Sequence, residues 1–172
     1  MGNPTIRKAC PEDFSILQKV GRRTFFETFE AGNTEDNMKD YLEKSFSDEK
    51  ITDELNNKES EFYLAVLDNS VIGYLKLNFG QAQTELWHSN AVEVERIYVL
   101  KEFQGRKAGQ LLFEKALTIA KEKGAAYVWL GVWEENEKAI QFYRKNGFTE
   151  FSRHIFVLGD DRQTDIMMKL IL

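Results

Sequence analysis

The 172-residue sequence contains little cysteine, histidine or proline. Its single cysteine, Cys10, cannot form an internal disulfide, which favours a reducing compartment such as the cytoplasm. Its two histidines, His88 and His154, have no partner at metal-ligand spacing, so we expect no metal site and expect His154 to line a strand face. With two prolines and no biased tract, the chain is not expected to be disordered.

Long apolar runs are also missing. No run approaches the roughly 20 residues that span a bilayer, and the N-terminal MGNPTIRKAC lacks the apolar core of a signal peptide. The sequence therefore predicts a cytoplasmic protein without membrane association.

Positive charge does not dominate the chain, which carries 23 Lys and Arg against 28 Asp and Glu, a net charge of −5. Affinity for nucleic acids rests largely on phosphate neutralisation by basic residues, so no direct nucleic-acid partner is expected. An acidic surface favours cationic partners, although modest negative charge also simply keeps a protein soluble.

The hydrophobic patterns predict one domain over residues 3–172, with a core supported by 42% hydrophobic residues. We expect helices from Pro11 to about residue 30 and over 33–46, 47–57, 108–123 and 136–146. Asn33 and Ser47 are the predicted N-caps of the second and third helices. Strands are expected over 5–9, 92–100, 125–133, 149–158 and 164–172, with a hairpin over 61–80 and loops at 81–91 and 159–163.

This order predicts an α+β fold. The strand–helix–strand unit over residues 92–133 implies a parallel pair with a right-handed crossover, whereas the hairpins imply antiparallel flanks. We therefore expect a mixed, mostly antiparallel sheet of about seven strands with helices on both faces.

The turn Gln104-Gly105-Arg106-Lys107-Ala108-Gly109 joins a strand to a helix. A helix N-terminus offers unpaired backbone N–H groups, glycines allow close approach to the backbone, and the basic pair adds charge. These features predict a site for a diphosphate, although an ordinary strand-to-helix turn would also use glycine. The patterns GxxxxGK[ST] and GxGxxG are absent, so a different phosphate-bearing cofactor is indicated.

Two motifs make the sequence recognisable: Q-x-x-x-x-G at 104–109 and N-x-x-A-x-x-F-Y-x-x-x-G-F at 136–148. With the flanking strands and helices, they resemble the GNAT family of acetyl-CoA-dependent N-acetyltransferases over nearly the whole chain. The resemblance implies the GNAT acyltransferase fold and acetyl-CoA as cosubstrate. One position departs from the family, because Lys107 stands where a glycine is usual, so the lysine must tolerate the backbone conformation of that glycine.

Three stretches, EVERIYV, LGVWEENEKAIQFYRKNGF and GDDRQTD, resemble more narrowly the polyamine acetyltransferases of bacilli. This resemblance predicts acetyl transfer to a primary amine, with spermidine and spermine as preferred substrates. Direct attack in a ternary complex is expected because no activated nucleophile is visible. The alternatives are another amine (an amino acid, an antibiotic or a protein N-terminus) and a regulator that binds acetyl-CoA without turnover.

Two carboxylates are candidate bases for the amine. Glu93 and Glu95 are two residues apart on one predicted strand and should share a face. By resemblance, Glu95 matches the carboxylate of animal polyamine acetyltransferases and Glu93 that of histone acetyltransferases. Either side chain could instead lie on a solvated face or form a salt bridge with Arg96 or Lys76.

The family resemblance makes Tyr143 the candidate acid that protonates the thiolate of coenzyme A, although its helical spacing also fits simple packing. Asn136 could bind the cofactor or only cap its helix. The predicted cofactor contacts are Ile97, Tyr98, Val99, Gln104, Gly105, Arg106, Lys107, Ala108, Gly109, Gln110, Asn136, Lys138 and Tyr143.

The amine site is expected between the helices over residues 25–55 and the loop at 80–91. Predicted substrate contacts are Glu30, Glu85, Trp133 and Glu134, in a region that also contains Phe26, Glu27, Phe29, Glu35, Asp36 and Trp87. Spaced carboxylates and aromatic faces suit a polyamine, but each could be an ordinary surface acid or core aromatic. The final strands could also pair between two copies in a homodimer.

Overall fold

We describe a computed structural model, which covers residues 2–85 and 88–172. Its strands are β1 (Thr5–Lys8), β2 (Ser60–Leu67), β3 (Ser70–Phe79), β4 (Ala91–Val99), β5 (Tyr127–Trp133), β6 (Thr149–Leu158) and β7 (Asp161–Ile171). Its helices are α1 (Phe14–Phe29), α2 (Glu35–Ser45), α3 (Asp48–Asn56), α4 (Ala108–Glu122) and α5 (Glu137–Lys145). Short 3₁₀ turns cover Pro11–Asp13, Glu30–Gly32, Gly80–Ala82 and Lys101–Phe103.

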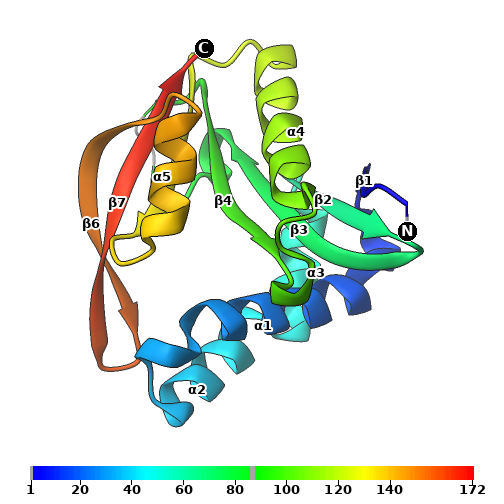
Figure 1. The fold of residues 1–172 in the computed structure, drawn as a ribbon, viewed down its shortest axis with the longest axis vertical. Helices are drawn as coiled ribbons and strands as arrows, with labels where there is room; N and C mark the ends of the chain where they lie inside the picture. The colour runs from blue at the N-terminus through cyan, green and yellow to red at the C-terminus, as the bar shows by residue number, and fades with distance from the viewer. Residues whose placement is uncertain (1, 86–87) are drawn as a thin grey trace.

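The strands form one sheet in the order β1-β2-β3-β4-β5-β7-β6 (Figure 1). Within the described chain, β4 and β5 are the one parallel pair, and α4 makes the crossover between them. All other neighbouring strands are antiparallel. The predicted α+β fold with a mixed, mostly antiparallel seven-stranded sheet is therefore confirmed.

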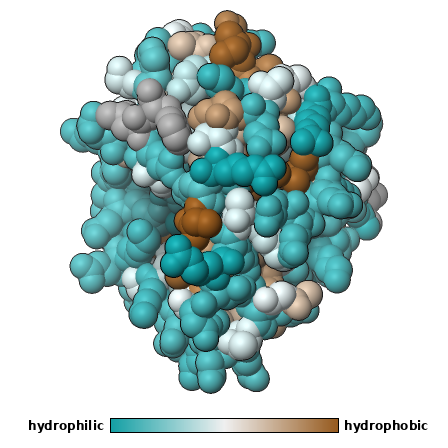
Figure 2. All heavy atoms as spheres, turned by 90° about the vertical axis from the view of Figure 1, so that its left-hand side faces the viewer, coloured by the Kyte–Doolittle hydropathy of each residue, from teal (hydrophilic) through white to brown (hydrophobic). Residues whose placement is uncertain are grey.

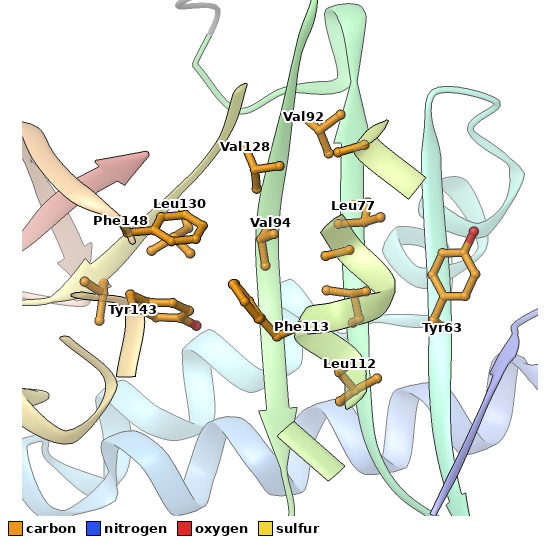
Figure 3. Packing of buried hydrophobic residues seen from close by; sticks show 14 of the residues in the cluster. Tyr63, Leu77, Val92, Val94, Leu112, Phe113, Val128, Leu130, Tyr143 and Phe148 are labelled. Carbon is orange, nitrogen blue, oxygen red and sulfur yellow. The ribbon is translucent and has the colours of Figure 1, made fainter. Parts of the chain in front are cut away.

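Helices cover both faces of this sheet, as predicted (Figure 1). One hydrophobic cluster packs α4 and α5 against the sheet, with Leu112, Phe113 and Tyr143 facing Val94 and Leu130 (Figure 3). A second cluster packs α1, α2 and α3 against the opposite face. The sheet therefore separates two chemical environments, and the candidate catalytic side chains are divided between them.

Short-range sequence signals explain most element boundaries. Asp68 and Asn69 adopt positive φ angles of 49° and 66°, as the tight turn between β2 and β3 requires. The side chain of Ser47 caps α3 as predicted. The prediction for α2 was wrong by one residue: Thr34 accepts the N–H of Asn37 and caps the helix, while Asn33 donates to the carbonyl of Phe29.

The last hairpin differs from the predicted loop at 159–163. The structure has a tight turn around Gly159, with φ of 63°, and β7 begins at Asp161. Arg162 pairs with Val157 and Gln163 with Phe156, so backbone pairing continues through polar residues. A hydrophobic pattern cannot reveal such an extension, because the strand gains hydrogen bonds there and not apolar burial.

Candidate active site

The parallel pair in the middle of the sheet opens into a gap. Residues 91–93 of β4 pair with 127–129 of β5, and the ladder between these strands ends there in the described chain. The segment Ile97–Val99 lies beyond that point, where it pairs with β3 on its other edge. Alternate residues of a strand direct their backbone groups to opposite edges. Part of the backbone of the predicted cofactor contacts Ile97, Tyr98 and Val99 therefore faces the gap, although the Val99 carbonyl accepts a hydrogen bond from Gln104.

A β-bulge sits on β4 beside this gap. The register with β3 shifts from Lys76 opposite Arg96 to Leu77 opposite Val94, which leaves Glu95 as the extra residue. A bulge bends its strand and turns a side chain from its regular direction. As a result, Glu95 reaches the same partner as Glu93, the side chain of Asn78.

Glu93 is a buried carboxylate that has no salt-bridge partner among the described residues. It is 4% exposed and accepts hydrogen bonds from Asn78 Nδ2 at 2.9 Å and from the backbone N–H of Thr84 at 2.7 Å. The Thr84 hydroxyl donates to its second oxygen. Burial raises the pKa of Glu93 above its ordinary value, since the loss of hydration outweighs these hydrogen bonds.

Glu95 lies in an ion-pair network instead. Its oxygens are 2.9 Å from Lys76 Nζ and 3.0 Å from an Arg96 nitrogen. Burial opposes its ionisation, but the charges of Arg96 and Lys76 outweigh burial and lower the pKa of Glu95 to about 2. The salt bridges that the sequence offered as an alternative are therefore present.

Glu54 of α3 completes this network and was missed by the sequence analysis. Its carboxylate pairs with both Lys76 and Arg96, from the helix layer above the sheet. A residue on a distant helix gives no local signal for such a contact, because it depends on how α3 packs over β3 and β4.

The turn before α4 has the backbone conformation that the diphosphate hypothesis needs. Gly105 and Lys107 have φ angles of 85° and 67°, so the lysine does adopt the left-handed conformation typical of glycine. The Lys107 carbonyl accepts the first helical hydrogen bond, from Leu111, which leaves earlier N–H groups of α4 without a helical acceptor. A side chain at Gly109 would meet nothing nearer than a Val99 methyl at 3.9 Å. The turn therefore fits an anion that approaches the backbone.

Side chains around the turn hold its shape. Gln104 donates from its amide to the carbonyl of Val99 at 3.2 Å, which ties the turn to the end of β4. The guanidinium of Arg106 lies 5.7 Å from the centre of the Phe103 ring. Gln110 donates to Glu114 on the same helix.

Tyr143 lies on the opposite face of the sheet from Glu93. The ring is 7% exposed, packs against Phe113 and Phe148, and points its hydroxyl toward β4 (Figure 3). Burial raises the pKa of Tyr143, so the phenol keeps its proton at neutral pH. The ring packing that the sequence offered as the alternative role is therefore present. The hydroxyl also points toward the gap, where it could donate a proton.

At the start of α5, the Asn136 side chain accepts the N–H of Ala139 at 3.2 Å, so it does cap the helix. Lys138 is exposed and is the second residue of α5. Whether either residue also contacts the cofactor stays a prediction.

The four predicted substrate residues each have their own contacts in the structure. Trp133 packs on Phe29, with ring centres 5.6 Å apart, whereas Glu30 begins the 3₁₀ turn after α1. Glu85 contacts the ring of His154. The side chain of Glu134 is 43% exposed and lies 3.5 Å from Arg153. Trp87, also predicted here, is outside the described residues.

His154 lies on β6, on the strand face that was predicted for it. In residues 2–85 and 88–172, no group of three His, Cys, Asp or Glu side chains could hold a metal ion. The helices of that part of the chain include none with the length and apolar character needed to cross a membrane.

The side of the molecule formed by β6 and β7 is mainly hydrophilic, with small separate apolar groups (Figure 2). Exposed apolar side chains on β6 include Ile155 and Val157, at 50% and 53% exposure. The predicted pairing of two copies through these strands stays a prediction.

Comparison with known proteins agrees with this arrangement. The family model described as "Acetyltransferase (GNAT) family" matches residues 24–148. An uncharacterized N-acetyltransferase from Lactobacillus delbrueckii subsp. lactis is 45% identical over 97% of this chain and 96% of its own length. The spermidine N(1)-acetyltransferase of Thermoplasma acidophilum is 29% identical over 83% of this chain and 86% of its own.

Among solved structures, the PaiA N-acetyltransferase of Thermoplasma acidophilum, in complex with coenzyme A, superimposes with a TM-score of 0.81. It shares 26% identity, and the match covers 99% of this chain and 100% of that one. The fold and the family match lead to one conclusion: this chain belongs to the GNAT family and is an acetyl-CoA-dependent N-acetyltransferase.

Proposed function

We propose that the chain acetylates a primary amine of a polyamine, with spermidine and spermine as preferred substrates. The spermidine acetyltransferase among its relatives supports this choice. So does the acidic character of the chain, which has a net charge of −5 and favours cationic partners.

Glu93 is the proposed base, and the contrast between its pKa and that of Glu95 carries this assignment. A carboxylate whose pKa lies near 2 is a weak base, whereas burial makes Glu93 more basic. Glu93 would take the proton of the substrate ammonium, directly or through water, and so expose the nitrogen lone pair. Glu95 would balance the positive charges of Lys76 and Arg96, and its hydrogen bond would hold the side chain of Asn78 in place.

Tyr143 is the proposed acid on the other side of the gap. When the amine nitrogen bonds to the acetyl carbon and the carbon–sulfur bond breaks, the nitrogen releases a proton to solvent and the thiolate needs one. A buried phenol with a raised pKa can donate it at neutral pH and regain a proton from solvent later.

The cofactor contacts follow from the backbone. N–H groups of Ala108, Gly109 and Gln110 at the start of α4 would bind the diphosphate of acetyl-CoA, assisted by the charges of Arg106 and Lys107. Backbone groups of Ile97–Val99 would bind the acyl-carrying arm in the gap, and Asn136 and Lys138 would approach it from α5. Acetyl-CoA supplies the activated acetyl group.

The deciding experiment is thiol release from acetyl-CoA at about pH 8, with spermidine, spermine, amino acids, an aminoglycoside and a peptide with a free N-terminus. We expect saturable release with the polyamines and the highest kcat/KM for them. Preference for another amine would replace the substrate assignment and keep the enzyme class. Tight acetyl-CoA binding without turnover on any amine would favour a regulator.

A further inference from the structure

The segment that follows β3 crosses the sheet beside Glu93. Gln83 accepts a hydrogen bond from the indole Nε1 of Trp129 on β5 at 2.7 Å, and Glu85 contacts a side chain of β6. Thr84, between these two contacts, bonds to Glu93 on β4. Trp129 is the register partner of Glu93, at the end of the β4–β5 ladder. The segment therefore lies where the gap between these strands begins.

The side chain of Gln83 fixes this segment. It is 7% exposed, and its Nε2 donates to the backbone carbonyls of Gly80 at 3.1 Å and His88 at 3.2 Å. Trp129, which donates to its Oε1, is fully buried. A buried amide with partners at both ends holds its surroundings rigidly. The next residue along the chain, Thr84, is therefore held in a defined position over Glu93.

Thr84 binds both oxygens of the Glu93 carboxylate. Its backbone N–H donates to Oε1 at 2.7 Å, and its hydroxyl donates to Oε2. Oε1 also accepts the amide of Asn78 at 2.9 Å. Glu93 is 4% exposed, whereas Thr84 is an exposed residue. The Thr84 hydroxyl therefore connects a buried carboxylate with the outside of the molecule.

A hydroxyl in this position can pass a proton inward. It has one donor and two acceptor lone pairs, so it can accept a hydrogen bond from an ammonium while it donates to Glu93. A proton can then move without any displacement of the buried carboxylate. This gives the substrate proton a third route, besides direct transfer and transfer through water.

We propose that Thr84 is a catalytic residue that relays the proton of the substrate ammonium to Glu93. The ammonium N–H bond breaks as its proton bonds to the Thr84 oxygen, and the original Thr84 O–H bond breaks as that proton bonds to Glu93 Oε2. The threonine stays neutral, the carboxylate becomes protonated and the amine gains its lone pair. Reverse transfer through the exposed hydroxyl to water restores the carboxylate. The inference rests on the proposed function, because it takes Glu93 as the base.

The surroundings of Glu93 determine how its pKa responds to a change at Thr84. Burial raises the pKa of Glu93 and the charge of Glu95 adds to this, while hydrogen bonds from Asn78 and Thr84 oppose it. Other titratable groups of this region have contacts of their own, namely Lys76, Arg96 and Glu54 in the network of Glu95, and Glu85 with His154. Removal of the Thr84 hydroxyl should therefore raise the pKa of Glu93 further.

The test compares Thr84→Val, which keeps the size of the side chain and loses the hydroxyl, with Thr84→Ser, which keeps the hydroxyl. Each variant is assayed over pH with the amine that gives wild type its highest kcat/KM. Where Glu93 is fully ionised, loss of a hydrogen bond alone would leave kcat unchanged or higher, because the base becomes stronger. We expect kcat of Thr84→Val to fall there by about tenfold to hundredfold, and its acid limb to move to higher pH. Thr84→Ser should restore both.

Thr118→Val is the matched control, since Thr118 is another exposed threonine, whose hydroxyl donates to the carbonyl of Glu114 on α4. It should keep the wild-type kcat and acid limb. Thr84→Ala replaces Thr84→Val if the valine variant does not fold. A wild-type kcat at high pH in the variant without the hydroxyl would overturn the relay, as would a Thr84→Ser variant equally slow.

Glu93→Gln separates the relay from the proposed function. A slow Glu93→Gln with a fast Thr84→Val would keep the base and remove the relay, whereas a wild-type kcat in Glu93→Gln would remove both. The double variant decides whether the two residues share one path. A double variant no slower than Glu93→Gln alone supports the relay, because residues that act as a unit are not additive. Losses that multiply would place Thr84 on a separate path and overturn it.

Discussion

Glu93 and Glu95 accept hydrogen bonds from the same nitrogen, the side-chain amide of Asn78, at 2.9 Å and 2.8 Å. Their pKa values nevertheless move in opposite directions. In the part of the chain that the structure describes, Glu93 is buried without a salt-bridge partner, while Glu95 lies between Lys76 and Arg96. One amide nitrogen therefore joins two carboxylates whose pKa values are shifted in opposite directions by their different surroundings.

The first prediction concerns Glu93→Gln, which keeps the shape of the side chain and removes its basicity. We expect kcat to fall by roughly 10²- to 10⁴-fold, the usual contribution of a general base. In the wild type, kcat should fall as pH drops through the raised pKa of Glu93, above the value of about 4.3 of a free glutamate. A variant with wild-type kcat and the same acid limb would exclude Glu93 as the base.

Glu95→Gln should affect stability more than chemistry. The folded-state pKa is about 2, below the unfolded value of about 4.3. The contribution of Glu95 is therefore present above the unfolded value and is lost as pH falls toward 2. Urea unfolding at neutral pH should show a loss of about 1–3 kcal/mol, and the difference from wild type should shrink in acid. A pH-independent difference would contradict the ion-pair explanation.

Tyr143→Phe removes the proposed acid and keeps the packing against Phe113 and Phe148. Turnover should decrease by on the order of 10²-fold, while affinity for coenzyme A, measured by calorimetry, should stay close to wild type. Equal rates for the two proteins would assign Tyr143 to packing alone.

Lys107→Gly separates backbone strain from charge. Since Lys107 has φ of 67°, glycine should stabilise the fold by about 1 kcal/mol. Loss of the positive charge should weaken coenzyme A binding at low salt and reduce its salt dependence. Affinity that is unchanged at every salt concentration would show that the Lys107 charge lies away from the diphosphate.

Gly109→Trp tests backbone access at the start of α4. The tryptophan should block approach of the diphosphate and lower affinity for coenzyme A. Gly109→Ala is the control, because its methyl group would lie 3.9 Å from the nearest atom and should fold and bind normally. If the tryptophan variant folds and binds like wild type, the diphosphate must bind elsewhere.

Local signals in the sequence predicted most of the fold. Hydrophobic patterns indicated the strands and helices, and Ser47 caps α3 as the sequence predicted. The candidate base and acid were named because they lie within recognisable motifs. Glu54 was not, since its place in the ion-pair network comes from partners on other elements. Contacts between distant segments depend on packing, which no short pattern encodes.

Because three residue pairs join β4 to β5 in the described chain, the sheet resembles two stiff plates with a hinge line between them. Longer antiparallel ladders hold β1–β4 on one side and β5, β7 and β6 on the other. The angle between the plates should therefore be the softest coordinate of the molecule. Glu93 is one of the three residues at the hinge, and Tyr143 follows the second plate through α5. Opening and closing the hinge would then change the separation of base and acid more readily than any single side-chain rotation.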